Sequence, residues 1–212
     1  MFEDGFPSEI ESVALATGYG PILRTSARES FSLRQQIFEQ VRASGRIARA
    51  TIARSLDVSP GSVTALTAEL ISDGFLREVE GAARETSRGR PPVALEVVPE
   101  ALRVVGVKLS DETHTAILTD LAGNLLASAA LASNTDKKTA TDLLRDAENL
   151  ITQLCTSAEI PMDTISAIGV GIAGIVDFES GMVAWSPLLQ NADVPLGQIF
   201  ADHFETPVRI DN

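Results

Sequence analysis

A helix-length amphipathic segment followed by a short apolar run limits the fold of this chain more than any other feature. Residues 139–159 carry apolar side chains at helical spacing along one side: Leu143, Leu144, Ala147, Leu150, Ile151 and Leu154. Residues 165–172 are almost continuously apolar and are bounded by glycine, as is typical of a strand buried in a parallel sheet. This order predicts an α/β domain. Its other predicted elements are strands over 104–109, 113–119, 125–132 and 208–210 and a helix over 196–204.

Three short helices are predicted upstream of this domain. The first covers 33–44 with Ser32 as its N-cap, and the second covers 49–56. The third begins after the N-cap Ser59, with Pro60 at its first position, and ends at residues 73–74. Residues 75–80 then alternate like a strand that can pair with residues 95–98. Three helices followed by a β-hairpin with a basic tip are the layout of a winged helix-turn-helix.

Charge divides the chain in a similar way. The net charge is −12, but residues 28–92 hold ten arginines against eight acids, whereas residues 93–212 hold six basic residues against seventeen acids. This asymmetry indicates two domains with different partners. The predicted organisation is a flexible leader over 1–29, a winged helix-turn-helix domain over 30–82, a wing and linker over 83–99, and the α/β domain over 100–212.

The third helix is a candidate DNA-reading element, because a helix-turn-helix places the start of its second helix at the base edges of the major groove. The candidate contacts there are small or hydroxyl-bearing residues: Ser59, Gly61, Ser62, Thr64 and Ala65. Arg46, Arg49 and Arg54 are candidates for gripping phosphates. The alternative interpretation is a helical hairpin whose polar residues simply face water.

The stretch SRGRPP, residues 87–92, adds a second candidate contact. Arginine enters a narrow minor groove favourably, and a glycine between two arginines lets the backbone lie flat on the groove floor. The prolines restrict the segment to extended conformations, which lowers the entropy lost on docking. Arg84, Arg88, Gly89 and Arg90 are therefore predicted to contact DNA. The alternative is a stiff, solvated linker.

Five segments in order resemble one known family. They are GRIARATIARSLDVSPGSVTALTAELISDGFLREVEG, SRGRPPVALEV, VVGVKLSDETHTAILTDLAGNLL, IGVGIAGIVDFESGMVAWSPLLQNADVPL and PVRIDN. They are similar to ROK-family transcriptional regulators, which join a winged helix-turn-helix to a domain derived from sugar kinases. The resemblance implies an α+β winged helix-turn-helix domain followed by a partial α/β lobe of the actin-like ATPase fold. It also implies a homodimer that binds double-stranded DNA, and a chain truncated within the kinase-like domain.

The resemblance also bears on nucleotide binding. Kinases of this family hold ATP phosphates with an Asp-x-Gly-Gly-Thr loop after their first strand. The corresponding positions, residues 108–113, read KLSDET. Both glycines are absent, and Asp111 and Glu112 stand where a polyphosphate would sit, so like-charge repulsion adds to lost backbone access. ATP binding, catalytic residues and a cofactor are therefore not expected.

The effector side of the resemblance points to two residues. Gly174 belongs to the glycine-rich loop that lies beside the sugar in the family, although glycines there can serve only a tight turn and close packing. Asn212 corresponds to the Asn that holds sugar hydroxyls. Residues Ser186-Pro187-Leu188-Leu189 stand where the family often carries an Asn, and Asn191-Ala192-Asp193 lacks the Trp common in the family. This departure leaves the identity of the sugar or sugar-derived effector open.

These observations favour a cytoplasmic DNA-binding regulator that represses carbohydrate-metabolism genes. The alternatives are a sugar kinase with an appended DNA-binding region and an inert interaction module. No apolar run approaches the length of a membrane span, and Cys155 is the single cysteine. His114 and His203 are each isolated in the sequence, so surface or strand-end positions are expected and no metal site is predicted.

Overall fold

The computed structural model describes residues 32–80 and 93–212. The chain divides between Val98 and Pro99 into two compact units. Within the described residues, no helix combines the length and the apolar character needed to cross a membrane.

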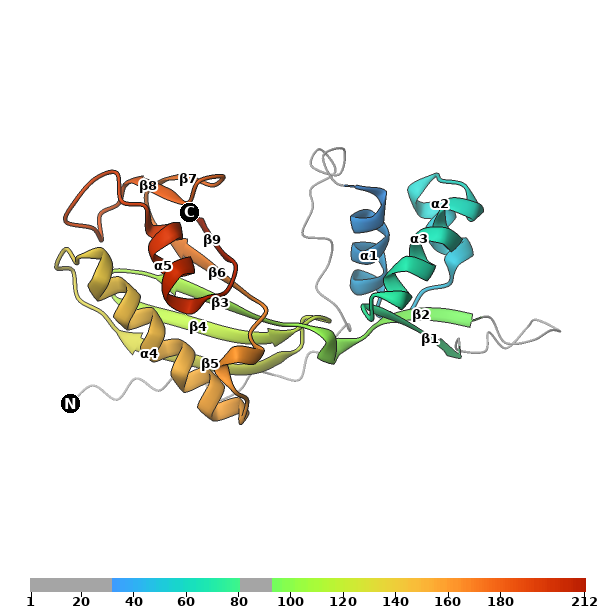
Figure 1. The fold of residues 1–212 in the computed structure, drawn as a ribbon, viewed down its shortest axis with the longest axis horizontal. Helices are drawn as coiled ribbons and strands as arrows, with labels where there is room; N and C mark the ends of the chain where they lie inside the picture. The colour runs from blue at the N-terminus through green and yellow to red at the C-terminus, as the bar shows by residue number, and fades with distance from the viewer. Residues whose placement is uncertain (1–31, 81–92) are drawn as a thin grey trace, which may run out of the picture. The chain divides into compact units, whose positions relative to one another are not determined.

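Residues 32–80 of the first unit contain three helices, α1 (Leu33–Ser44), α2 (Arg49–Leu56) and α3 (Pro60–Ser72) (Figure 1). The three predicted helices are confirmed. They could be predicted because their capping residues and apolar spacing act within a few residues. The Ser32 hydroxyl accepts the N–H of Gln35, whose side chain accepts the N–H of Ser32 in return. The Ser59 hydroxyl accepts the N–H of Ser62 at 3.0 Å and begins α3.

A small apolar core joins these helices to a two-stranded antiparallel sheet. Strand β1 (Leu76–Glu80) pairs with β2 (Val93–Val97), with Leu76 opposite Val97. Ile47, just before α2, exchanges two backbone hydrogen bonds with Leu95, at 3.1 and 2.8 Å. The side chains buried in this core include Ile37, Val41, Ile52, Val63, Leu70, Leu76 and Leu95.

The second unit is built around a five-stranded sheet of order β5-β4-β3-β6-β9. Its strands are β3 (Arg103–Leu109), β4 (Thr113–Asp120), β5 (Leu125–Ala132), β6 (Ala167–Ile172) and β9 (Val208–Asp211). Strands β3, β6 and β9 are parallel, whereas β4 is antiparallel to both of its neighbours. The carboxyl ends of β3, β6 and β9 therefore meet at one edge of the sheet.

Two helices, α4 (Ala140–Ala158) and α5 (Leu196–Phe204), pack on one face of this sheet (Figure 1). Helix α4 starts at a capping box between Thr139 and Asp142 and buries Leu143, Leu150 and Leu154. The strands alternate accordingly: Val105 and Val107 point into this core, while Gly106 and Lys108 belong to the opposite face. The amphipathic helix and the buried parallel strand predicted from the sequence are both confirmed.

Two details of the second unit differ from the sequence prediction. Strand β6 begins at Ala167 and not at 165, because residues 162–164 form a short 3₁₀ helix whose Met162 carbonyl accepts the N–H of Ile165 at 3.1 Å. In addition, β7 (Ile175–Asp177) and β8 (Met182–Trp185) form a hairpin that the sequence reading did not predict.

The turn of this hairpin packs backbone to backbone against the start of α5. Gly181 has φ +68°, and its carbonyl accepts the N–H of Gly197 at 2.9 Å. A Cβ added at Gly197 would lie 2.9 Å from the Cα of Gly181, closer than real Cβ contacts allow. The two glycines are therefore needed by the packing of the second unit itself.

We expect Gly197→Ala to destabilise the second unit by about 1–3 kcal/mol, the usual cost of forcing extra volume into a packed site. Gly61→Ala is the matched control, because Gly61 is also the second residue of its helix but a Cβ there meets only the Ser59 hydroxyl, at 3.8 Å. That control gains helix propensity and should be neutral or stabilising. Denaturant unfolding measures both; equal effects of the two substitutions would contradict this account.

Candidate nucleic-acid interface and ligand pocket

The start of α3 brings together four of the residues predicted to contact DNA. The hydroxyl oxygens of Ser59 and Ser62 lie 2.8 Å apart, and the Thr64 hydroxyl donates to the carbonyl of Pro60 at 2.8 Å. Gly61 and Thr64 are exposed, and no side chain obstructs the backbone at Gly61. The first turn of α3 therefore carries only small side chains and presents hydroxyl groups at the surface.

The electrostatics of this helix end favour an anion. The first turns of α2 and α3, both wholly within the described residues, contain no acidic side chain. Unpaired N–H groups at a helix N-terminus carry partial positive charge, so both helix ends attract negative groups. An open hollow of about 620 Å³ runs along α2 to the start of α3, and it is lined by Arg49, Ala50, Ala53, Arg54, Val58, Pro60 and Thr64 and by one acid, Asp57.

Arg46, predicted to grip a phosphate, pairs with an acid of the same unit. Its Nε lies 2.7 Å from Glu96 Oε2, and Arg77 Nε lies 2.7 Å from Glu96 Oε1. Burial raises the pKa of Glu96, but the hydrogen bonds and charges of Arg77 and Arg46 outweigh it and hold the pKa below its usual value. Arg46 is still 62% exposed, so its remaining N–H groups reach solvent.

Arg49 links three elements of the first unit. Its Nε donates to the Thr67 hydroxyl at 2.8 Å, and its Nη1 lies 2.8 Å from Glu78 Oε1. Thr67 is buried on α3, and its hydroxyl donates in turn to the carbonyl of Val63 at 2.8 Å. Arg49 therefore fixes α3 relative to α2 and β1. This role was missed from the sequence, where only a polar Thr67 on an apolar helix side hints at a buried partner.

Of the other arginines predicted to contact DNA, only Arg54 lies within the described residues. Arg54 is exposed and bonds within its own helix, to the Ala50 carbonyl and the Thr51 hydroxyl, each at 3.3 Å. Arg84, Arg88, Gly89 and Arg90 lie outside the described residues. Their contact with DNA stays a prediction.

In the second unit, the edge where β3, β6 and β9 end holds an open pocket of about 440 Å³. It is lined by Lys108, Leu109, Ser110, Asp111, Gly171, Ile172, Ala173, Pro187, Leu188 and Asn212. Ligands of open α/β sheets bind outside the carboxyl ends of the strands, where the chain turns to opposite sides of the sheet. We name this hollow the edge pocket.

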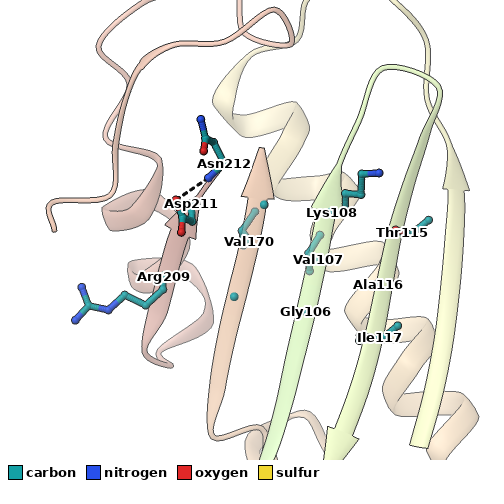
Figure 2. A pocket seen from close by; sticks show the side chains of 12 residues that line it. Gly106, Val107, Lys108, Thr115, Ala116, Ile117, Val170, Arg209, Asp211 and Asn212 are labelled. Atoms are coloured by element: carbon teal, nitrogen blue, oxygen red, sulfur yellow. Dashed lines mark hydrogen bonds between the residues drawn. The ribbon is translucent and has the colours of Figure 1, made fainter. Parts of the chain in front are cut away.

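Asn212 and Gly174, the two predicted effector contacts, are joined here. The Asn212 side-chain amide donates to the Gly174 carbonyl at 2.7 Å, and the Asn212 backbone N–H donates to Asp211 Oδ1 at 2.8 Å (Figure 2). Gly174 has φ +150°, and a Cβ there would lie 2.1 Å from the Trp185 carbonyl oxygen. Asn212 lines the edge pocket, whereas Gly174 acts by holding the Asn212 side chain and by packing closely against β8.

A second hollow, of about 490 Å³, lies on the sheet face that α4 and α5 leave open (Figure 2). It is lined by three glycines, Gly106, Gly169 and Gly171, and by the charged residues Lys108, Arg209 and Asp211. It shares Lys108, Gly171 and Asn212 with the edge pocket.

The turn between β3 and β4 lies within residues 108–113, which the sequence resemblance aligns with a kinase phosphate loop. Asp111 and Glu112 are exposed there, and the N–H of Ser110 donates to His114 Nδ1 at 3.0 Å. That amide is therefore engaged inside the protein. The turn presents carboxylates where a phosphate loop presents backbone N–H groups.

His114 lies at the start of β4, as the strand-end alternative predicted, but the prediction that it is isolated or on the surface is wrong. Its ring is fully buried beneath the edge pocket turn, with Nε2 3.2 Å from Lys138 Nζ and 3.3 Å from Asp146 Oδ2. Burial and Lys138 lower the pKa of His114, while Asp146 acts in the opposite direction. The residues that surround the ring come from a distant segment, which is why local sequence did not reveal them. His203 also has a partner, Glu148 Oε1 at 3.2 Å.

The sequence of the second unit identifies the family. Residues 104–212, just over half of the chain, match the ROK family, and the chain belongs to it. It is 33% identical over 168 residues to the xylose repressor of Caldicellulosiruptor bescii, a match that covers 78% of this chain and 41% of the relative. It is 27% identical over 171 residues to the DNA-binding transcriptional repressor Mlc of Escherichia coli, covering 79% and 41%.

A solved structure shows the same fold. It is described as the ROK family transcriptional regulator, homolog of E. coli MLC protein, and matches with a TM-score of 0.64 at 22% identity, over 84% of this chain and 44% of that one. The chain thus spans about two fifths of the length of the curated relatives it matches.

Proposed function

We propose that this chain is the DNA-binding and effector-sensing part of a transcriptional regulator, a repressor of carbohydrate-metabolism genes. The observation that supports it best is the exposed, acid-free start of α3, which carries Ser59, Gly61, Ser62 and Thr64. The relatives named above are a xylose repressor and a DNA-binding repressor, and they match over more than three quarters of this chain.

On this proposal the first unit is a winged helix-turn-helix, with α3 as the recognition helix. Its first turn would meet base edges in the major groove, while the N-terminal end of α2 meets the phosphate backbone. Arg49 would hold α3 at the required angle through Thr67 and Glu78. Arg84, Arg88, Gly89 and Arg90 would enter the adjacent minor groove from the wing and linker.

The second unit would sense a sugar or a sugar-derived metabolite in the edge pocket. Asn212 supplies an amide, and Asp111 and Ser110 supply oxygen atoms, groups that suit the hydroxyls of a neutral polyol. The exposed carboxylates of Asp111 and Glu112 disfavour a polyphosphate at the same turn, so we propose no kinase activity. In a homodimer, an effector that binds one arrangement of the two DNA-binding units more tightly would shift the population toward it. Such a regulator would act in the cytoplasm.

The DNA-binding proposal is tested by Gly61→Asp. An acidic side chain at a helix N-terminus stabilises the free helix by about 0.3–1 kcal/mol, yet it would face the phosphates of bound DNA. We expect affinity for DNA from upstream of the gene to fall roughly tenfold or more, since ~1.4 kcal/mol of repulsion already gives that factor. Fluorescence anisotropy measures the affinity, and thermal unfolding measures the stability.

The matched control is Gly61→Asn, which has the same size without the charge. It should bind DNA more tightly than Gly61→Asp does. Equal affinity of the wild type and both variants would place α3 outside the interface and contradict the proposal.

Effector sensing is tested by a thermal-shift screen of pentoses, hexoses and N-acetylhexosamines on the full-length protein. A sugar that binds the folded state raises the melting temperature by mass action. We expect at least one sugar to do so, and Asn212→Ala to abolish the shift. Asn124→Ala is the control, because Asn124 bonds Asp120 in the β4–β5 turn. No shift with any sugar, in protein that binds DNA, would contradict a sugar-sensing role.

A further inference from the structure

The two walls of the edge pocket come from segments far apart in the sequence. One wall is the turn after β3, at Ser110 and Asp111, and the other is the loop at Pro187 and Leu188. Each of these segments is irregular backbone, so its position depends on hydrogen bonds from elsewhere. Both sets of bonds lead to one polar cluster, formed by the buried His114 and the partly exposed Lys138 and Asp146.

The first wall is held directly by His114. The Nδ1 atom accepts the N–H of Ser110 at 3.0 Å, so a neutral ring carries its proton on Nε2. The Nε2 atom lies 3.3 Å from Asp146 Oδ2, which can accept its proton, and 3.2 Å from Lys138 Nζ, which is itself paired with the same Asp146 oxygen at 2.6 Å. This arrangement uses both ring nitrogens, one as acceptor and one as donor.

The second wall is held by Lys138. Its ammonium group lies 2.6 Å from Asp146 Oδ2, the same oxygen that faces the histidine ring. Its backbone N–H donates to the Leu188 carbonyl at 2.7 Å, and its carbonyl accepts the N–H of Gln190 at 3.0 Å. Lys138 therefore clamps the loop that contains Leu188 on both sides.

We propose that His114 is a positioning residue of the edge pocket, which holds the Ser110 wall through Nδ1 and the Leu188 wall through Asp146 and Lys138. The inference rests on the proposed function in one respect: the pocket is taken to be where the effector binds. His114 itself is fully buried and does not line the pocket, so it shapes the site without touching the ligand.

The arrangement requires a neutral ring. A protonated ring donates from both nitrogens, so its Nδ1–H would face the N–H of Ser110, donor against donor. Within the described residues, the charged groups that act on the His114 ring are Lys138, just before α4, and Asp146 on α4. The residue opposite His114 on β5 is the apolar Leu131. Burial and Lys138 lower the pKa of His114, with Asp146 opposing them.

The sign of the pH dependence follows from that direction. With a folded-state pKa below the ordinary value of 6.5, unfolding or opening of the cluster takes up a proton. The stabilisation of both walls is therefore complete above pH 6.5 and is lost as the pH falls through the lowered pKa. Effector affinity should weaken over the same range.

The test is hydrogen exchange of the backbone amides of Ser110, Lys138 and Gln190 in the full-length protein, expressed as protection factors. In the wild type, protection of the Ser110 amide should fall as the pH is lowered from 7 to 5, while amides within β6 keep theirs. His203→Asn, which removes the other histidine, should leave this profile unchanged. A Ser110 amide whose protection does not change with pH would overturn the proposal.

Two variants of His114 test its contacts to the two walls separately. Asn at position 114 places an acceptor near the Nδ1 position, so His114→Asn should keep Ser110 protected and abolish the pH dependence, but lower protection at Lys138 and Gln190 about tenfold. The longer Gln side chain reaches toward the Nε2 position. His114→Gln should therefore keep Lys138 and Gln190 protected and lower the protection of Ser110. Equal protection at all three amides in both variants would overturn the proposal, as would equal loss throughout β4 and α4.

These measurements need no ligand, so they decide the role of His114 even if no sugar binds. Where the thermal-shift screen identifies a sugar, its affinity should follow the same pH profile in the wild type and become independent of pH in His114→Asn. A sugar whose affinity falls equally with pH in both proteins would contradict the positioning role while leaving effector sensing intact.

Discussion

Because the chain has a net charge of −12, the proposed binding of a polyanion depends on the charges closest to one helix end. Helix α3 begins with Ser59, Pro60 and Gly61, and its first turn carries no acid. Salt screens the repulsion between the DNA and acidic residues far from the interface, because charges more than about 10 Å apart are largely screened at 0.1 M ionic strength. The local field at the start of α3 therefore matters more than the total charge.

Two arginines of the first unit contact acidic residues on other elements. Arg46 and Arg49 pair with Glu96 and Glu78, and these pairs hold α2, α3 and the β1–β2 sheet together. Such residues orient the helices, while their exposed N–H groups remain available to phosphates. An arginine can thus serve the fold and the proposed interface at once, which a count of positive charges does not reveal.

The turn between β3 and β4 of the second unit differs in two ways from a phosphate-binding loop. Where a kinase offers free N–H groups, this turn carries Asp111 and Glu112, and the N–H of Ser110 is bound by His114. The polar cluster of His114, Lys138 and Asp146 then links this turn to the Leu188 loop. The edge of the sheet keeps a pocket, while its backbone donors are used inside the protein.

The sequence predicted what local signals determine. The bounds of α2 and the caps at Ser32 and Ser59 were correct, because hydroxyl caps and helical spacing act within a few residues. The β7–β8 hairpin was missed, because strands of three and four residues are too short to show an alternating pattern. Thr67, the partner of Arg49, and Lys138, a partner of His114, were missed because they lie 18 and 24 residues away along the chain.

The most direct measurement of the central claim is the salt dependence of DNA affinity for the wild-type, full-length protein, using the DNA upstream of its gene. Each phosphate contact adds about −0.9 to the slope of log K against log salt concentration. We expect tight binding at low salt and a linear decrease with a slope that corresponds to several phosphates. Absence of binding at low ionic strength, or an affinity that does not change with salt, would contradict the claim that the start of α3 and the arginine-rich segment clasp a DNA duplex.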